Sequence, residues 1–158
     1  MRRRGEALGV GAWVVAGLCL LAPGQARASC QIRSVVGLNF ANYTPTSPLP
    51  LDTVGSITYL CLLQLTPMTI DLSPGNSGAH SNRRMRGPSP SNTLSYNLYV
   101  DATRLLIWGN GASGTSRYGP VIPVLALDVT VPIYGRIPAQ QSVPAGAYSD
   151  TLVMTMTF

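Results

Sequence analysis

Short segments with apolar side chains at alternate positions recur along the chain, separated by turns rich in Gly and Pro. A period of two places the apolar side chains on one face of a β-strand. Seven segments have this character, over residues 32–40, 55–63, 68–72, 94–100, 105–108, 124–134 and 152–158. Turn chemistry separates them at 44–50, 73–78, 87–92, 109–114 and 138–146. No capped helical stripe follows residue 28, so the pattern predicts an antiparallel β-sandwich of about seven strands.

The first 28 residues have a different pattern, which is typical of a secretory signal peptide. Three arginines at positions 2–4 precede an apolar run over 9–22, and Ala26-Arg27-Ala28 provides small residues for cleavage. The apolar run would span only about 21 Å as a helix, short of a hydrocarbon core of about 30 Å. We therefore expect residues 1–28 to be removed, leaving residues 29–158 as a single domain with no transmembrane span.

The mature chain carries little charge and one pair of cysteines. It retains seven Arg and five Asp, too small an excess of positive charge to support nucleic-acid binding. Cys30 and Cys61 are the two cysteines left after cleavage, and an oxidising compartment favours their pairing. In the chain-entropy model such a disulfide stabilises the fold by about 3–4 kcal/mol. The pair is a poor zinc site because the chain has one histidine, His80.

Residues suited to catalysis are few and scattered. No Glu follows the leader, His80 lies in a Ser- and Gly-rich loop, and the nucleophile elbow, zinc-protease and phosphate-loop motifs do not occur. The sequence therefore predicts a protein that is not an enzyme, with no catalytic residues, no metal site and no cofactor. The cluster of Arg83, Arg84 and Arg86 is compatible with a solvated strand entry or with a contact to phosphate or glycan.

The last segment alternates most cleanly of all. Its apolar side chains share one face: Leu152, Met154, Met156 and Phe158. Termini that are not part of a sheet tend to be polar, so some other element must cover this face. Either the strand belongs to the core of a complete sandwich, or the sheet lacks its next strand and this edge accepts one from another polypeptide.

Several strings, in order, resemble the spore coat protein U domain family, which includes subunits of archaic chaperone-usher pili. They include Leu38-Asn39-Phe40, Gly55-Ser56-Ile57 and the run from Leu94 to Tyr99. The closing strings, over 134–140 and 144–151, are the most specific. The resemblance extends from Cys30 to Phe158.

The resemblance implies an incomplete immunoglobulin-like β-sandwich that lacks its final strand. It also implies export through the periplasm to the cell surface, with a periplasmic chaperone, an outer-membrane usher and neighbouring pilus or coat subunits as partners. Leu152, Met154, Met156 and Phe158 would then line a groove that receives a donated strand, and the family's cysteine pairing matches Cys30 and Cys61.

One departure from a polymerising subunit concerns the N-terminus. Cleavage after Ala28 would leave only Ser29 before Cys30, whereas a donated strand needs roughly 5 to 10 residues. The sequence therefore favours a terminal, tip-like subunit that accepts a strand. Two alternatives stay open: a self-folding spore or cell coat protein, and a secreted ligand-binding module using loops 73–82 and 109–117.

Overall fold

The computed structural model describes residues 29–123 and 126–158, and these form two antiparallel β-sheets. The strands are β1 (Ser29–Val36), β2 (Leu51–Leu62), β3 (Met68–Leu72), β4 (Arg83–Arg86), β5 (Thr93–Tyr99), β6 (Tyr118–Val121), β7 (Asp128–Ile137) and β8 (Met154–Thr157). Two single-turn 3₁₀ helices, η1 (Gly75–Ser77) and η2 (His80–Asn82), precede β4. The expected all-β class with two antiparallel sheets is confirmed, and the leader over 1–28 lies outside the described residues.

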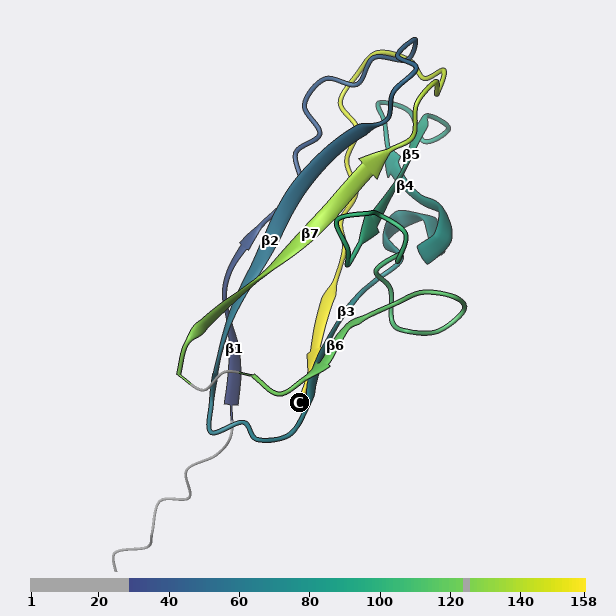
Figure 1. The fold of residues 1–158 in the computed structure, drawn as a ribbon. Helices are drawn as coiled ribbons and strands as arrows, with labels where there is room; N and C mark the ends of the chain where they lie inside the picture. The colour runs from purple at the N-terminus through teal and green to yellow at the C-terminus, as the bar shows by residue number, and fades with distance from the viewer. Residues whose placement is uncertain (1–28, 124–125) are drawn as a thin grey trace, which may run out of the picture.

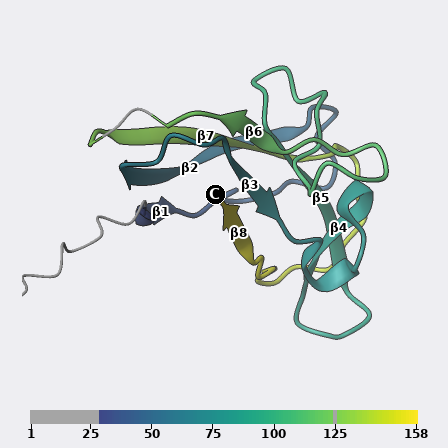
Figure 2. The same cartoon turned by 90° about the horizontal axis from the view of Figure 1, so that it is seen from below.

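The two sheets differ in size and face each other (Figures 1 and 2). The larger has the order β1-β2-β7-β5-β4, and the smaller has the order β6-β3-β8. The longest ladder joins β2 to β7, from Leu51 opposite Ile137 to Leu60 opposite Asp128. Each sheet ends on the same side of the molecule, the larger at β1 and the smaller at β8.

The core lies between the sheets and follows the period-two pattern of the strands. In β2 the inward positions are buried, and Ile57, Tyr59 and Cys61 alternate with partly exposed neighbours. Trp108, from the loop after β5, is fully buried and its Nε1 donates a hydrogen bond of 2.9 Å to the Ile70 carbonyl of β3. The indole therefore joins the two sheets rather than forming a stacking surface.

The expected strand over 105–108 is wrong. Asp101 accepts hydrogen bonds from the amides of Leu105 and Leu106 at 3.3 and 2.8 Å, which holds the segment in a tight loop. The other two residues of the segment, Ile107 and Trp108, take part only in isolated bridges. Residues 105–108 are apolar, as a strand would be, but the hydrogen bonds from their amides to the Asp101 side chain replace those that a β-ladder would need.

Two strands were missed in the sequence. β4 consists largely of arginines, and β6 contains Gly119-Pro120, residues that argue against a strand unless it lies at an edge. Both lie at sheet edges. The expected strand over 124–134 begins in the structure at Asp128 and extends to Ile137, while residues 124 and 125 are outside the described part of the chain.

Candidate functional site

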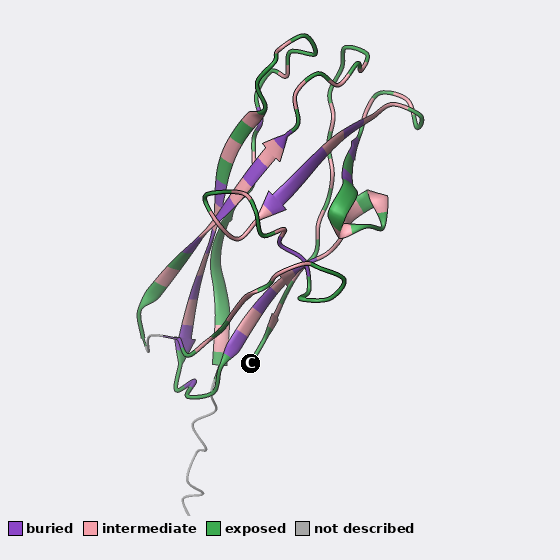
Figure 3. Ribbon diagram, turned by 45° about the vertical axis from the view of Figure 1, so that its right-hand side comes forward, coloured by how far each residue is buried: buried purple, intermediate pink, exposed green. Residues whose placement is uncertain are grey.

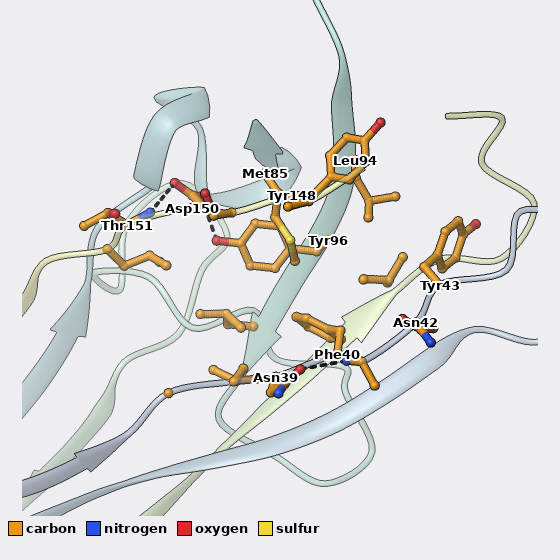
Figure 4. Close-up of a pocket in the computed structure, with 18 of the residues that line it drawn as sticks. Asn39, Phe40, Asn42, Tyr43, Met85, Leu94, Tyr96, Tyr148, Asp150 and Thr151 are labelled. Carbon is orange, nitrogen blue, oxygen red and sulfur yellow. Dashed lines mark hydrogen bonds between the residues drawn. The ribbon is translucent and has the colours of Figure 1, made fainter. Parts of the chain in front are cut away.

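A long apolar groove opens between the two sheets, with a cavity volume of about 1140 Å³ (Figure 4). One wall is the segment that follows β1, residues 37–43, and the other is the segment leading into β8, residues 143–154. The floor consists of inward side chains of the core strands: Ile57, Leu72, Met85, Leu94, Tyr96, Leu98, Ile133 and Ile137. Core residues of both sheets are thus reached from one open side.

The first wall packs on two glycines of the larger sheet, Gly55 of β2 and Gly135 of β7. A Cβ on Gly55 would lie 2.5 Å from the Val36 carbonyl oxygen and 3.3 Å from Leu38 Cγ. Pairing of β1 with β2 ends at Val36 opposite Ser56, after which Leu38 and Phe40 turn toward the core. A Cβ on Gly135 would lie 2.3 Å from Leu38 Cδ2 and 2.7 Å from Phe40 Cζ, so only glycine leaves room for both side chains. Phe40 also packs edge-to-face against Tyr96, with ring centroids 6.1 Å apart.

The second wall is fixed by Asp150. Its Oδ2 accepts a 2.7 Å hydrogen bond from the Tyr96 hydroxyl of β5, and its Oδ1 accepts bonds from the amides of Asn76 and Thr151 (Figure 4). Burial, together with the hydrogen bond to this carboxylate, raises the pKa of Tyr96 well above its ordinary value. Ser149 exchanges two backbone hydrogen bonds with Arg86, at 2.8 and 2.9 Å, and so attaches the wall to β4.

Arg83 lies beneath this wall and is completely buried. Its guanidinium donates to the carbonyls of Ser73 and Trp108, at 2.8 and 2.7 Å, and to Asn97 Oδ1 at 2.9 Å. Desolvation lowers the pKa of Arg83, although a guanidinium stays charged in proteins. Arg83 is therefore a structural tie between loops and strands and is not available to a ligand.

The decisive feature of the groove is exposure of side chains that face the interior. Ile32 and Val35 of β1 lie opposite Tyr59 and Ile57, and like them point between the sheets. Tyr59 and Ile57 are 1% and 0% exposed, whereas Ile32 and Val35 are 39% and 55% exposed. Figure 3 shows that β1, the strand joined to the grey trace, is exposed along most of its length. In the described structure, the inner face of β1 is thus left uncovered, which is what a sandwich with one strand too few would show.

The predicted groove residues lie on or near the opposite side. Leu152 and Met154 line the groove, and Met156 packs against the core from β8. Phe158 is 52% exposed at the end of the chain, beyond β8. The structure therefore brings Leu152, Met154 and Met156 to one edge and leaves Phe158 outside the groove lining.

The Cys30–Cys61 disulfide forms as expected and joins directly opposed residues of β1 and β2. Sequence reasoning missed the first wall, Leu38 to Tyr43, and the inward side chains Ile32 and Val35. A strand over 32–40 was predicted, but simple alternation would place Ile32 and Val35 on opposite faces, and the irregular register between Ile32 and Ser34 brings them to the same one. Which strand borders an opening also depends on sheet order.

Other residues singled out in the sequence have structural partners. His80 Nε2 lies 3.0 Å from the Leu72 carbonyl, and Asp71 pairs with Arg117 at 3.1 Å. The loops 73–82 and 109–117, the alternative ligand-binding region, meet around a small cavity of about 230 Å³ that is lined by His80 and Asn110 among others. In residues 29–123 and 126–158, no three His, Cys, Asp or Glu side chains gather as metal ligands. Over the same residues, none of the helices is long and apolar enough to cross a membrane.

The fold and groove define an immunoglobulin-like β-sandwich with an open side. The model of the Spore Coat Protein U domain matches residues 18–155, and this chain belongs to that family. It is 40% identical over 146 residues to Protein U of Myxococcus xanthus, covering 82% of this chain and 78% of that protein.

A solved structure has a similar fold. It is the crystal structure of the CsuC-CsuE chaperone-tip adhesion subunit pre-assembly complex from archaic chaperone-usher Csu pili of Acinetobacter baumannii. The TM-score is 0.58 at 21% identity, and the match covers 84% of this chain. The chain spans 40% of the length of the solved chain that it matches.

Proposed function

We propose that this protein is a surface subunit of the chaperone-usher type, which accepts a β-strand from another polypeptide in the groove between β1 and β8. The exposed interior-facing pair Ile32 and Val35 carries the proposal, because a strand laid beside them would bury both. Such a strand would also satisfy the free backbone edges of β1 and β8. On the opposite side it would meet Leu152, Met154 and Met156, with Phe158 at its end.

The partners follow from this mode of binding. A periplasmic chaperone would fill the groove first, an outer-membrane usher would receive the complex, and a neighbouring pilus or coat subunit would replace the chaperone. Family membership and the chaperone complex with a similar fold support this route. Export requires a leader, and the signal-like residues 1–28, with residues 29–158 as the mature domain, fulfil that requirement.

A tip position is the second part of the proposal. β1 begins at Ser29, so cleavage after Ala28 would leave no segment to donate to another subunit. A subunit that accepts a strand without giving one ends a fibre. Finding a polymer of this chain alone, joined by N-terminal strands, would contradict the tip position and leave the groove proposal standing.

The groove is tested by producing the full chain in a periplasm with and without a candidate pilus chaperone. We expect recovery as a one-to-one complex, with aggregation of the chain when it is produced alone. Val35→Asp places a charge in the groove and should abolish the complex. Val36→Asp is the matched control, because Val36 is 57% exposed and points to the opposite face of the same strand.

Two results would overturn the groove proposal. One is a free monomer with sharp, reversible unfolding and no affinity for the chaperone. The other is a complex that forms equally well with Val35→Asp and Val36→Asp.

An adhesive role is favoured by a second apolar surface, which shares only Phe158 with the proposed groove. The strand ends at one pole carry exposed large apolar side chains: Leu62, Leu63, Leu65, Ile122, Leu127 and Phe158. Leu63 also has a φ of 57°, a conformation that costs an L residue about 1–2 kcal/mol. Exposed apolar patches often mark interaction sites.

Adsorption to polystyrene beads tests the adhesive role. We expect weaker adsorption after Leu63→Ser with Leu65→Ser than after Leu105→Ser with Leu106→Ser. The second pair is also exposed but lies in the loop after β5. Equal adsorption of the two variants would contradict an adhesive pole.

A further inference from the structure

The positive charge of the described chain is unevenly neutralised. Four of its arginines pair with aspartates: Arg33 with Asp128, Arg104 and Arg136 with Asp52, and Arg117 with Asp71. Arg83 is buried and bonded to carbonyl and amide oxygens. Among the described residues, Arg84 and Arg86 are the exposed arginines that have no acidic side chain within ion-pair distance.

These two arginines are held in one orientation by β4. The strand alternates, with Arg83 and Met85 buried and Arg84 and Arg86 exposed, so the two exposed guanidinium groups start from the same face. Two residues along a strand correspond to about 7 Å. Neighbouring strand β5 holds one side of β4, and the Ser149 bridge holds the other at Arg86.

The residues opposite Arg84 and Arg86 on the neighbouring strand β5 carry hydroxyl groups and not carboxylates. Directly across the ladder, Arg84 faces Ser95 and Arg86 faces Thr93. Opposite charges are the stabilising cross-strand partners of an exposed arginine, so these positions leave the charges free. Serine and threonine hydroxyls can both donate and accept hydrogen bonds, as sugar hydroxyls do.

We propose that Arg84 and Arg86, with Thr93 and Ser95, form a docking site for a linear anionic polysaccharide. Each guanidinium would bind a carboxylate or sulfate group with two parallel hydrogen bonds, and the hydroxyls would contact the sugar between them. This site lies on the outer face of β4 and β5 and is independent of the groove. It goes beyond the proposed function, since a coat or pilus subunit could hold or lack it.

Other partners fit the pair less well. Proteins that hold duplex DNA by its phosphates use about six to ten contacts, and two arginines are too few. A membrane surface would gain only about 1 kcal/mol from each charge. A different role for Arg84 and Arg86 would be to protect the edge strand β4 against association with the sheet of another molecule. In that case a variant without these two charges would aggregate, and its binding to polysaccharide would not change.

Chromatography on immobilised heparin, a sulfated polysaccharide, tests the site. The protein is used as recovered from the periplasm, with chaperone alone as a blank if the two are recovered together. We expect retention of the wild type at low salt, and at least about tenfold weaker binding for Arg84→Gln with Arg86→Gln. Arg33→Gln with Arg117→Gln removes the same formal charge from paired positions and should bind like the wild type.

A competition experiment defines the ligand class. Soluble polygalacturonate, which carries carboxylates, should release the protein from heparin, while neutral dextran should not. The site is refuted if the wild type is not retained, if the Arg84 and Arg86 variant is retained equally, or if the control variant loses binding equally. Stronger competition by duplex DNA than by either polysaccharide would also refute it. The two proposals fail separately: a free, stable monomer without affinity for the chaperone would overturn the groove, whereas loss of heparin retention by protein recovered with its chaperone would overturn this site.

Discussion

Residues that are neighbours in the sequence of this protein can differ completely in burial and in their contacts. Arg83 and Arg84 are adjacent, yet one is a buried tie between Ser73, Asn97 and Trp108 and the other is exposed. The strand period of two decides this, because β4 turns alternate residues to opposite faces. A charge cluster in a strand is therefore divided by the fold, and two of its three arginines, Arg84 and Arg86, can meet a ligand.

A second single side chain, Tyr96, should make the free energy of unfolding decrease at alkaline pH. Burial and the hydrogen bond to Asp150 raise its pKa in the folded state, while the unfolded chain releases this proton near pH 10. The contribution of Tyr96 is thus fully present below pH 10 and is lost as the pH rises above it. The free energy of unfolding of the chain that carries the C-terminal strand extension described below, measured by urea titration from pH 8 to 11, should fall above pH 10.

Tyr96→Phe provides the control for this prediction. It removes the titrating group but keeps the ring that packs against Phe40. The variant should be less stable at pH 8 and less sensitive to pH above 10. Parallel curves for the two proteins would show that Tyr96 is not responsible; Tyr59, whose pKa burial also raises, would then be examined in the same way.

Among the elements, β1 is the one with the least packing of its own. Nearly all of its residues are exposed, and its only ladder is with β2. The Cys30–Cys61 disulfide sits at the first rungs of that ladder, where it holds the strand in register. The groove depends on β1, so the disulfide supports the groove through this strand.

Replacing both cysteines by alanine should cost about 3–4 kcal/mol of stability, because the disulfide closes a loop of 31 residues. Urea unfolding with and without reductant, in the background of the C-terminal strand extension described below, measures the loss. The wild type under reductant should resemble the Cys30→Ala, Cys61→Ala variant, and the variant should not respond to reductant. A difference below about 1 kcal/mol would mean that the ladder alone keeps β1 in place.

In the whole molecule, two sheets of unequal width leave one side open. The larger sheet ends at β1 and the smaller at β8, and Phe158 follows directly after β8. A strand added after Phe158 through a two-residue turn would run back along the free edge of β8. Such a strand should fill the groove from within the same chain.

We expect this extended protein to be recovered as a stable monomer without a chaperone. An eight-residue extension with alternating Val and Thr should give a Tm about 5 °C or more above that of the control extension described next. The reason is that its apolar side chains cover Ile32, Val35 and Met154. The matched control replaces each Val of the extension by Ser and should remain dependent on the chaperone. Equal Tm values for the two extensions would contradict an open groove, and thermal unfolding followed by circular dichroism provides the measurement.

The sequence by itself determined the strand class, the disulfide pairing and the apolar face of the last strand. These are local properties: side-chain alternation sets a face, and two cysteines in one exported domain allow one pairing. The strand predicted at 105–108 is wrong because the local hydrogen bonds to Asp101 compete with a ladder. The strands β4 and β6 were missed because arginine and proline are tolerated there only at sheet edges, and edge positions depend on neighbouring strands.

Only the tertiary structure decided where the opening lies. Ile32 and Val35 are three residues apart, and they share a face of β1 because the register shifts between Ile32 and Ser34. Both are exposed because β1 is the last strand of its sheet in the described structure. Likewise, Gly55 and Gly135 acquire their role only when Leu38 and Phe40 pack over them. Burial depends on which strands become neighbours, and in a β-sandwich those neighbours come from distant parts of the chain.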